Sequence, residues 1–299
     1  MLYVLGLIAG FTLANQSPIN AKLGSLLRSP FRSSLLSFTV GTIFLIICYV
    51  FSDQKMNPIT NVAVSNPWWI WSGGFLGVIF LTSNILMFPK LGAIQTIILP
   101  IIGQVMMSLL IDTFGWFSIK PIPLTMSRLI AVVLTNRSSL DNKLVHNQIN
   151  SHINSWRVWG VIVGAISALQ QAINGRVGHL INSPIASAGM SFLIGTIFIF
   201  FIVLIKEHSI LPPNIHILSK PKWLFTGGIL GAFFVFSTTF LVPILGAGMT
   251  VTLGLSGSII GSIVVSQFGL WQSPKQVVSR FQIIGILVML GSITLIKFS

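Results

Sequence analysis

The chain has 299 residues, of which 53% are hydrophobic and only 7% are charged, and its mean hydropathy is +0.91. A soluble domain keeps about a quarter of its residues charged, so this composition excludes a soluble protein and indicates one that resides in a bilayer. The 17 Lys and Arg residues give a net charge of +13. They are scattered between apolar runs without interleaved stacking aromatics, which argues against a nucleic-acid partner.

Apolar runs alternate with turn-forming and charged segments along the whole chain. In chain order they lie near 2–21, 34–51, 68–88, 93–112, 158–176, 187–205, 222–242, 246–266 and 281–297. Crossing the hydrocarbon takes about 20 residues, so most of these runs are long enough to span it. All eight tryptophans stand at or just beyond the ends of runs, where an amphipathic ring is best placed at the headgroup level.

The second half of the chain repeats the first at a spacing of 154 residues. The clearest matches are Gln16 with Gln170, Asn20 with Asn174, Lys22 with Arg176, Ser29 with Ser183, and Gly41 with Gly195. The register holds without a gap when 4–115 is laid on 158–269, with about a third of the positions identical. One unit has therefore been duplicated.

The fifth element differs between the two copies. After Arg280 the chain is apolar over 281–296, whereas after Arg128 only 129–134 are continuously apolar. Six helical residues span about 9 Å, which cannot cross about 30 Å of hydrocarbon, so this element is either a stub or also uses 122–126. We expect a first membrane unit at 1–135 with a short fifth helix near 123–135, a polar cytoplasmic linker at 136–157, and a second unit at 158–299.

The positions of the basic residues predict the topology. With the N-terminus outside and five crossings per half, twelve of the 17 Lys and Arg fall in inner loops and five fall outside. An even number of crossings per half would turn the cation-rich loops of the second half outward. We therefore expect an all-α polytopic membrane protein of about ten transmembrane helices, built as two inverted five-helix repeats.

Polar side chains inside the first apolar run of each half are the main candidates for a site. An inverted repeat places its substrate site near the midplane, between the halves. An amide in lipid without a partner costs several kcal/mol, so these side chains must face protein or a wet cavity. They either hydrogen-bond helices together or line a translocation path. The candidate solute-binding residues are Gln16, Asn20, Gln170, Gln171, Asn174, Gln104 and Asp112.

Three further features carry structural expectations. Asp112 closes an apolar run, which is more typical of a solvated helix end than of an intramembrane functional acid. Pro18 removes a backbone donor, so a broken first helix is expected in the first half, whereas Ala172 takes its place in the second. Glycines spaced four apart indicate close helix packing. The segments 89–93 and 243–247 are expected to be tight turns.

Five short patterns resemble those of a known family. They are Q-x-x-I-N-[AG]-[KR]-x-G, S-F-x-x-G-T, G-G-x-x-G and P-x-L-G-A, which occur in both halves, and D-x-F-G, which occurs after residue 111. This succession resembles the YdcZ-type inner-membrane exporters of bacteria, within the drug/metabolite transporter superfamily. The resemblance covers 4–135 and 158–297. It implies a fused two-unit, ten-helix, multi-pass transporter of the bacterial inner membrane with its halves in inverted orientation, which agrees with the N-terminus-outside topology that the charge count predicts.

The resemblance also bears on the substrate. Related small multidrug transporters carry a glutamate in the first helix, which exchanges protons for cationic substrates. At this depth the present chain has Asn15 and Gln16 in one half, and Leu169 and Gln170 in the other. All four are neutral, which favours uncharged or weakly polar solutes.

The sequence thus leaves two hypotheses. The first is a secondary transporter, an exporter of a small metabolite or drug-like solute. The second is a non-transporting membrane scaffold whose glycine ladders bind a partner protein. The expected partners are the lipid bilayer and a small-molecule solute, and the choice between a monomer and a homodimer stays open. No nucleophile elbow, phosphate loop or ligand-spaced histidine pair occurs, so we expect no enzyme activity, no cofactor and no metal.

The odd number of crossings per half can be tested by labelling. Reporters placed at residue 1 and at residue 150 are expected to lie on opposite sides of the membrane, because five crossings separate them. Impermeant labelling of intact cells and of inverted vesicles measures the side of each reporter. Finding both in one compartment would rule out the inverted arrangement.

Overall fold

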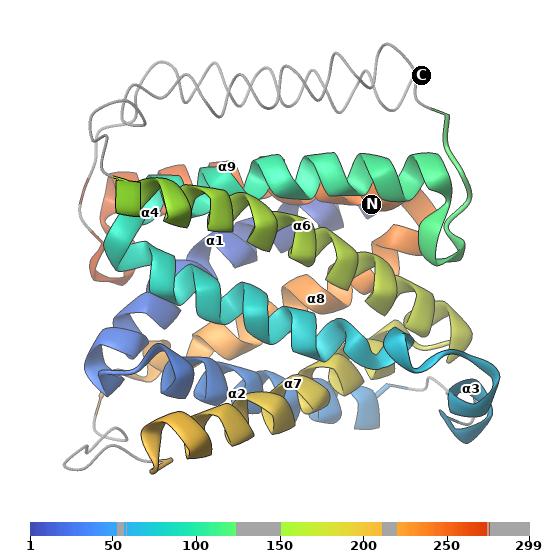
Figure 1. Cartoon of the computed structure of the whole chain (residues 1–299), viewed down its shortest axis with the longest axis horizontal. Coiled ribbons are helices and arrows are strands. Elements are labelled where there is room, and N and C mark those ends of the chain that lie inside the picture. The colour runs from blue at the N-terminus through green and yellow to red at the C-terminus, as the bar shows by residue number, and fades with distance from the viewer. Residues whose placement is uncertain (53–56, 58, 124–150, 211–219, 274, 276–299) are drawn as a thin grey trace.

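The computed structural model describes residues 1–52, 57, 59–123, 151–210, 220–273 and 275, and all regular structure in them is helical (Figure 1). The α-helices are α1 (Leu2–Leu27), α2 (Pro30–Val50), α3 (Ile59–Ser65), α4 (Gly73–Phe114), α6 (Ser151–Leu180), α7 (Pro184–Glu207), α8 (Thr226–Leu245) and α9 (Ala247–Phe268). Short 3-10 turns are η1 (Trp68–Ser72), η2 (Trp116–Ser118), η5 (Lys222–Phe225) and η6 (Leu270–Gln272).

Seven helical segments in the described ranges are long and apolar enough to cross a membrane, and Leu99–Phe114 is a shorter apolar helix. Their outward faces are apolar as well: Ile43 and Ile47 on α2, and Ile197 and Phe201 on α7, are each about half exposed. Exposed apolar side chains on long helices are the pattern that a lipid environment requires. The chain is therefore a multi-pass helical membrane protein.

Some expected features fall outside the described residues. These are the fifth helix of each half, at 124–135 and 281–297, and most of the linker. Helix α6 begins at Ser151, so residues 151–157, which we assigned to the polar linker, are helical. The domain boundaries themselves stay predictions.

The first two helices of each half are joined by the same elbow, because both copies carry Ser-Pro at this point. Ser29 adopts an extended backbone, and its Oγ accepts a hydrogen bond from the Arg32 backbone N–H at 3.2 Å. Ser183 does the same for Ala186, also at 3.2 Å. The proline that follows occupies the first helical position, where its missing N–H costs nothing. The residue before each serine, Arg28 or Asn182, takes a left-handed conformation.

Helix α1 is continuous through Pro18, so the break expected in the first half is absent. A single proline removes one backbone hydrogen bond, and the close packing of α1 on its neighbours evidently outweighs that loss. The first helix is thus continuous in both halves, so any path for a solute must run beside this helix and not through a break in it.

Helix α4 has 42 residues and would measure about 63 Å if it were straight. Instead it folds back on itself: Met87 and Leu99 both lie against the same position, Gly160 on α6. Figure 1 shows the two arms of α4 running in opposite directions. The reversal lies where the sequence predicts it, but the expected turn at 89–93 is wrong in one respect, because this stretch is helical.

In the second half the chain also reverses direction at this point, but here the helix is interrupted. Gly246, at φ 84° and ψ 164°, separates α8 from α9. This backbone region is open essentially to glycine alone. The N-terminus of α9 that results is capped by the side chain of Asp112. The residue at the corresponding place in the other half is Ser266, whose hydroxyl is too short and too weak an acceptor to bond two successive N–H groups.

The two halves contact each other reciprocally. The first helix of each half lies on the last described helix of the other: Gly10 abuts Gly254, and Gly164 abuts Pro100. A Cβ added at either glycine would overlap the opposing backbone carbonyl. The glycine ladders are therefore packing surfaces that lie inside the chain, as their spacing predicts.

At the centre of the interface, residues 154 apart face their own counterparts. The Oγ1 atoms of Thr42 and Thr196 are 2.9 Å apart, and the ring centroids of Phe38 and Phe192 are 5.0 Å apart. A residue meets its own counterpart only across a two-fold relation. In Figure 1, α1 runs from right to left and α6 from left to right, and the same opposition holds for α2 and α7.

Two glycines on α9 give a matched test of this packing. A Cβ at Gly257 would overlap the Leu7 carbonyl on α1, whereas the nearest atom to a Cβ at Gly254 is 3.8 Å away, an ordinary contact. We expect Gly257→Ala to lower the free energy of unfolding by about 1–3 kcal/mol. Gly254→Ala should be neutral or stabilising by up to about 1 kcal/mol. Melting in mild detergent measures both, and equal melting temperatures would contradict the packing described.

Candidate functional site

Gln16 on α1 and Gln170 on α6 meet at a small cavity between the halves. The cavity has a volume of about 30 Å³, and both glutamines are buried, with about one-twentieth of their surface exposed. Its walls consist largely of counterpart pairs: Phe38 with Phe192, Gly77 with Gly231, Phe80 with Phe234, and Leu81 with Val235. The cavity therefore lies on the pseudo-two-fold axis that relates the two halves.

Glycines make the room that these two amides occupy. A Cβ at Gly231 on α8 would overlap the Gln16 amide nitrogen, and one at Gly77 on α4 would approach the Gln170 amide nitrogen to 2.5 Å. Within the described part of the chain, neither amide has a hydrogen-bond partner. Since an amide in an apolar interior needs a partner, these two groups are free to bind water or a solute.

Asn20 and Asn174 have a structural role, by contrast. The Ser37 hydroxyl donates to Asn20 Oδ1 at 2.6 Å, and Asn174 Nδ2 donates to the Ser191 hydroxyl at 3.2 Å. Their backbone carbonyls also accept hydrogen bonds from the second helix of the same half. These asparagines pin the first helix to the second in each half, which is the interhelical bonding that the sequence offered as one reading.

Gln171 and Gln104 share one partner. Both amide nitrogens donate to the Ser167 hydroxyl, at 3.3 and 3.2 Å, and so link α6 to the second arm of α4. Gln104 also lines a second cavity of about 40 Å³, which shares Leu13 and Phe80 with the first. The two cavities are thus neighbours within one polar seam.

Asn84 on α4 lines this second cavity and was not singled out from the sequence. It is buried, and its Oδ1 atom has no hydrogen-bond partner. The available signal was an amide in the middle of the apolar run 68–88. Its counterpart in the other half is Thr238, so a search for matched amides passes over it.

Asp112 is not a solvated boundary residue, and that expectation is wrong. It is about 1% exposed, and its two carboxylate oxygens accept hydrogen bonds from the backbone N–H groups of Ala247 and Gly248, each at 2.8 Å. A carboxylate at a helix N-terminus satisfies orphan donors and opposes the helix dipole favourably. Asp112 therefore joins α4 of the first half to the start of α9 in the second.

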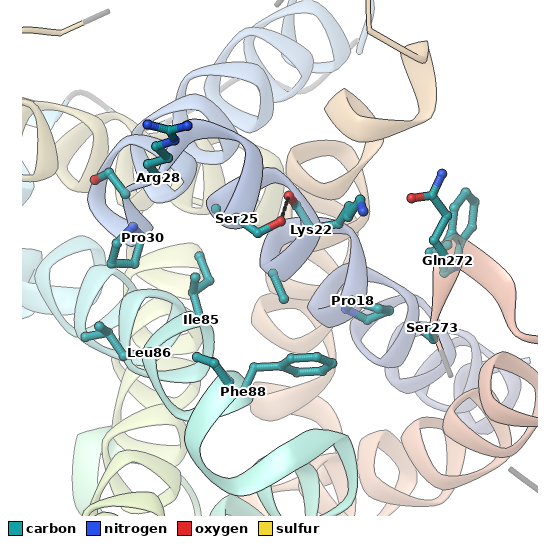
Figure 2. Close-up of a pocket in the computed structure, with 15 residues that line it drawn as sticks. Pro18, Lys22, Ser25, Arg28, Pro30, Ile85, Leu86, Phe88, Gln272 and Ser273 are labelled. Atoms are coloured by element: carbon teal, nitrogen blue, oxygen red, sulfur yellow. Dashed lines mark hydrogen bonds between the residues drawn. The ribbon is translucent and has the colours of Figure 1, made fainter. Parts of the chain in front are cut away.

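A much larger pocket, of about 440 Å³, lies at the C-terminal end of α1. Figure 2 shows Lys22 and Gln272 on one side of it and Ile85, Leu86 and Phe88 on the other. None of the solute-binding residues expected from the sequence lines this pocket. In the ranges that the structure describes, no group of three His, Cys, Asp or Glu side chains could hold a metal ion.

One of the comparisons with known proteins identifies a membrane exporter family. A family model described as "Putative inner membrane exporter, YdcZ" matches residues 1–136 and 155–295. One solved crystal structure, described only as that of a protein, covers 99% of this chain with 96% of its own, at a TM-score of 0.67 and 13% identity. At that identity the likeness shows the fold alone. Comparison with curated proteins yields no match.

The cap that Asp112 places on α9 can be measured. We expect Asp112→Ala to lower the free energy of unfolding by about 2–3 kcal/mol, because two buried N–H groups lose a charged acceptor. Asp112→Asn keeps one acceptor and should cost about half as much. Ser266→Ala, the same site in the other half, is the control and should stay within about 0.5 kcal/mol. Unchanged melting of Asp112→Ala in detergent would contradict the cap.

Proposed function

Because this chain belongs to the YdcZ family of inner-membrane exporters, we propose that it is a secondary transporter that exports a small metabolite or drug-like solute by alternating access. The observation that carries this proposal is the cavity on the two-fold relation, lined by the unpartnered amides of Gln16 and Gln170. A site between related halves is where secondary transporters bind their substrates.

We propose further that the chain crosses the membrane ten times, as two inverted five-helix units. The opposite directions of α1 and α6, and the counterpart contacts at Thr42 and Phe38, support this arrangement. Eight of the ten proposed crossings correspond to apolar helical segments in the described ranges, and the proposal assigns the other two to the fifth element expected in each half.

The proposed orientation places the N-terminus outside. The C-terminal ends of α1, α7 and α9 and the bend of α4 gather at the left of Figure 1. These ends and the loops beyond them hold most of the basic residues, among them Lys22, Arg28, Lys90, Lys206 and Lys275. Positive charge marks the inner face of a bacterial membrane protein, so this end is taken as cytoplasmic.

The central cavity is closed to a solute in the conformation described. A volume of about 30 Å³ holds one or two water molecules and nothing larger. Transport therefore requires the halves to move apart at one end while they stay in contact at the other. Part of the interface suits such rocking, because at Gly10, Gly164 and Gly257 helix backbones contact each other without intervening side chains.

The chemistry of the cavity is neutral. An amide offers both a donor and an acceptor, so each glutamine can bind a hydroxyl, carbonyl or amide of a solute without transferring a proton. The aromatic rings of Phe38, Phe80, Phe192 and Phe234 supply an apolar surface beside them. The central site thus suits a molecule with an apolar body and a few neutral polar groups.

The scaffold hypothesis depended on glycine ladders left open to lipid and to a partner. Gly6 contacts Leu253, Gly160 contacts Leu99, and Gly74 contacts the backbone of α7. These ladders are occupied by helices of the same chain. The glycine ladders, which would have favoured binding of a partner protein if they were open, instead pack the helices of this chain together.

The pair of glutamines provides the functional test. A thermal-shift screen of a metabolite library first selects a solute that stabilises the purified protein, since a ligand stabilises the state that it binds. We then expect Gln16→Leu combined with Gln170→Leu to reduce flux of that solute into inverted membrane vesicles by about tenfold or more, a loss of at least about 1.4 kcal/mol. Insertion should be unaffected.

Gln267→Leu provides the control, because this exposed glutamine near the end of α9 undergoes the same chemical change away from the cavity. Flux through this variant should match that of the wild type. If the double variant also transports normally, Gln16 and Gln170 are not on the path.

A further inference from the structure

The pocket at the end of α1 is large enough to hold a small organic molecule. Its volume of about 440 Å³ is over ten times that of either central cavity, at about 30 and 40 Å³. Small-molecule sites in proteins typically measure about 300–1,000 Å³. Its walls come from the last turns of α1, the end of the first arm of α4, and the turn that follows α9 (Figure 2).

The walls are of two kinds. One is apolar and is formed by Pro18, Ala21, Ile85, Leu86, Phe88 and Pro89. The other is polar and is formed by Lys22, Ser25, Arg28 and Gln272, all of which carry hydrogen-bond donors. In Figure 2 these polar residues lie across the pocket from Ile85, Leu86 and Phe88. A ligand that fits both walls is amphipathic.

The charge on the polar wall is uncompensated. None of the lining residues is acidic, and neither Lys22 nor Arg28 forms an ion pair within the described ranges. The acid close by is Glu207, which accepts a hydrogen bond from the Ser29 hydroxyl at 2.6 Å and lies 3.6 Å from an Arg32 nitrogen. Glu207 is thus already engaged, and two positive charges remain to attract an anion.

Membrane orientation alone does not account for this arrangement. Basic residues at the inner end help to orient the chain, but that role needs no cavity beside them. The second half shows the contrast: Arg176, the counterpart of Lys22, lies over the Trp69 ring at 5.5 Å. Asn57 covers the same end, donating hydrogen bonds to the carbonyls of Leu180 and Ile181. In the first half, by contrast, Lys22 lines the pocket.

The pocket also adjoins the central seam. Pro18 and Ile85 line the pocket, whereas the residues directly before them, Ser17 and Asn84, line the 40 Å³ cavity. The two spaces therefore share the wall formed by α1 and α4.

We propose that this pocket is an anion-binding vestibule that admits amphipathic organic acids, with a carboxylate or phosphate group attracted by the charges of Lys22 and Arg28 and an apolar body against Ile85, Leu86 and Phe88. As a statement about the exported substrate class, this proposal rests on the proposed transport function. It departs from the expectation of uncharged or weakly polar solutes, because it places a charged group at the vestibule while the central cavity is neutral. An anionic phospholipid headgroup presents the same chemistry and is the other source of such a group.

Binding can be tested on the full chain without any transport assay. The protein is reconstituted in phosphatidylcholine nanodiscs and titrated calorimetrically with 4-iodobenzoate and with the neutral 4-iodobenzyl alcohol. We expect the carboxylate to bind at least about tenfold more tightly than the alcohol, because it alone makes charge-assisted contacts. Equal affinities would overturn the proposal.

A double variant tests the two cations. Lys22→Gln with Arg28→Asn should weaken carboxylate binding about tenfold or more while leaving binding of the alcohol unchanged. Asparagine suits position 28, because the backbone there is left-handed, with φ 51°, and the counterpart Asn182 has φ 54°. Lys206→Gln, which removes a cation outside the pocket, should bind like the wild type. Undiminished binding in the double variant would refute the site, and unchanged melting confirms that it folds.

A lipid arm separates the two sources of the anion. In nanodiscs that contain phosphatidylglycerol, loss of carboxylate binding in the wild type supports the same site with a lipid headgroup as its occupant. Retained binding supports a soluble organic acid. Absence of any carboxylate binding in both kinds of nanodisc overturns the proposal.

The experiment distinguishes this proposal from the transport function. The Gln16→Leu, Gln170→Leu variant should bind 4-iodobenzoate normally, since its changes lie outside the vestibule. Binding without flux in the wild type would reject transport and leave the anion site standing, whereas flux without carboxylate binding would do the reverse.

Discussion

The close approach of each first helix to the opposite half is the constraint on which this structure depends. In a bilayer there is little hydrophobic gain from helix association, so the helices must approach until their backbones touch. Glycines at 10, 164 and 257 permit this approach. Once α1 and α6 are fixed in this way, Gln16 and Gln170 have nowhere to lie except over the glycines of the opposing third helices. The polar cavity is therefore a product of the packing.

Divergence after duplication has made the two ends of the bundle different. The Ser-Pro elbows and the asparagine pins remain alike, so both halves keep one fold. Lys22 and Arg176, however, have come to serve different surroundings, one facing a pocket and the other an indole ring.

Much of this arrangement could be predicted from the sequence, since hydropathy and an ungapped repeat fix the helices and pair their residues. The meeting of Gln16 with Gln170 follows from that symmetry. The capping role of Asp112 could not be predicted, because its partners are backbone groups 135 and 136 residues away, which no side-chain pattern reveals. Asn84 was not identified as a candidate, because its counterpart in the other half is a threonine and not a second amide. The pocket at the end of α1 could not be predicted, because its shape depends on where α4 reverses direction. The sequence indicates a turn at Pro89, whereas the helix continues through this residue.

The facing hydroxyls of Thr42 and Thr196 make more short contacts than they have hydrogens to donate. Each oxygen lies 2.8 Å from the carbonyl four residues earlier, of Phe38 or Phe192, and the two oxygens are 2.9 Å apart. Three short contacts need three hydrogens, and two hydroxyls supply two. Either both threonines keep their own carbonyls and the two oxygens are merely in contact, or one hydroxyl turns from its carbonyl to donate to the other. Whenever the two hydroxyls do bond to each other, one donates and the other accepts, so the two halves differ at their point of contact.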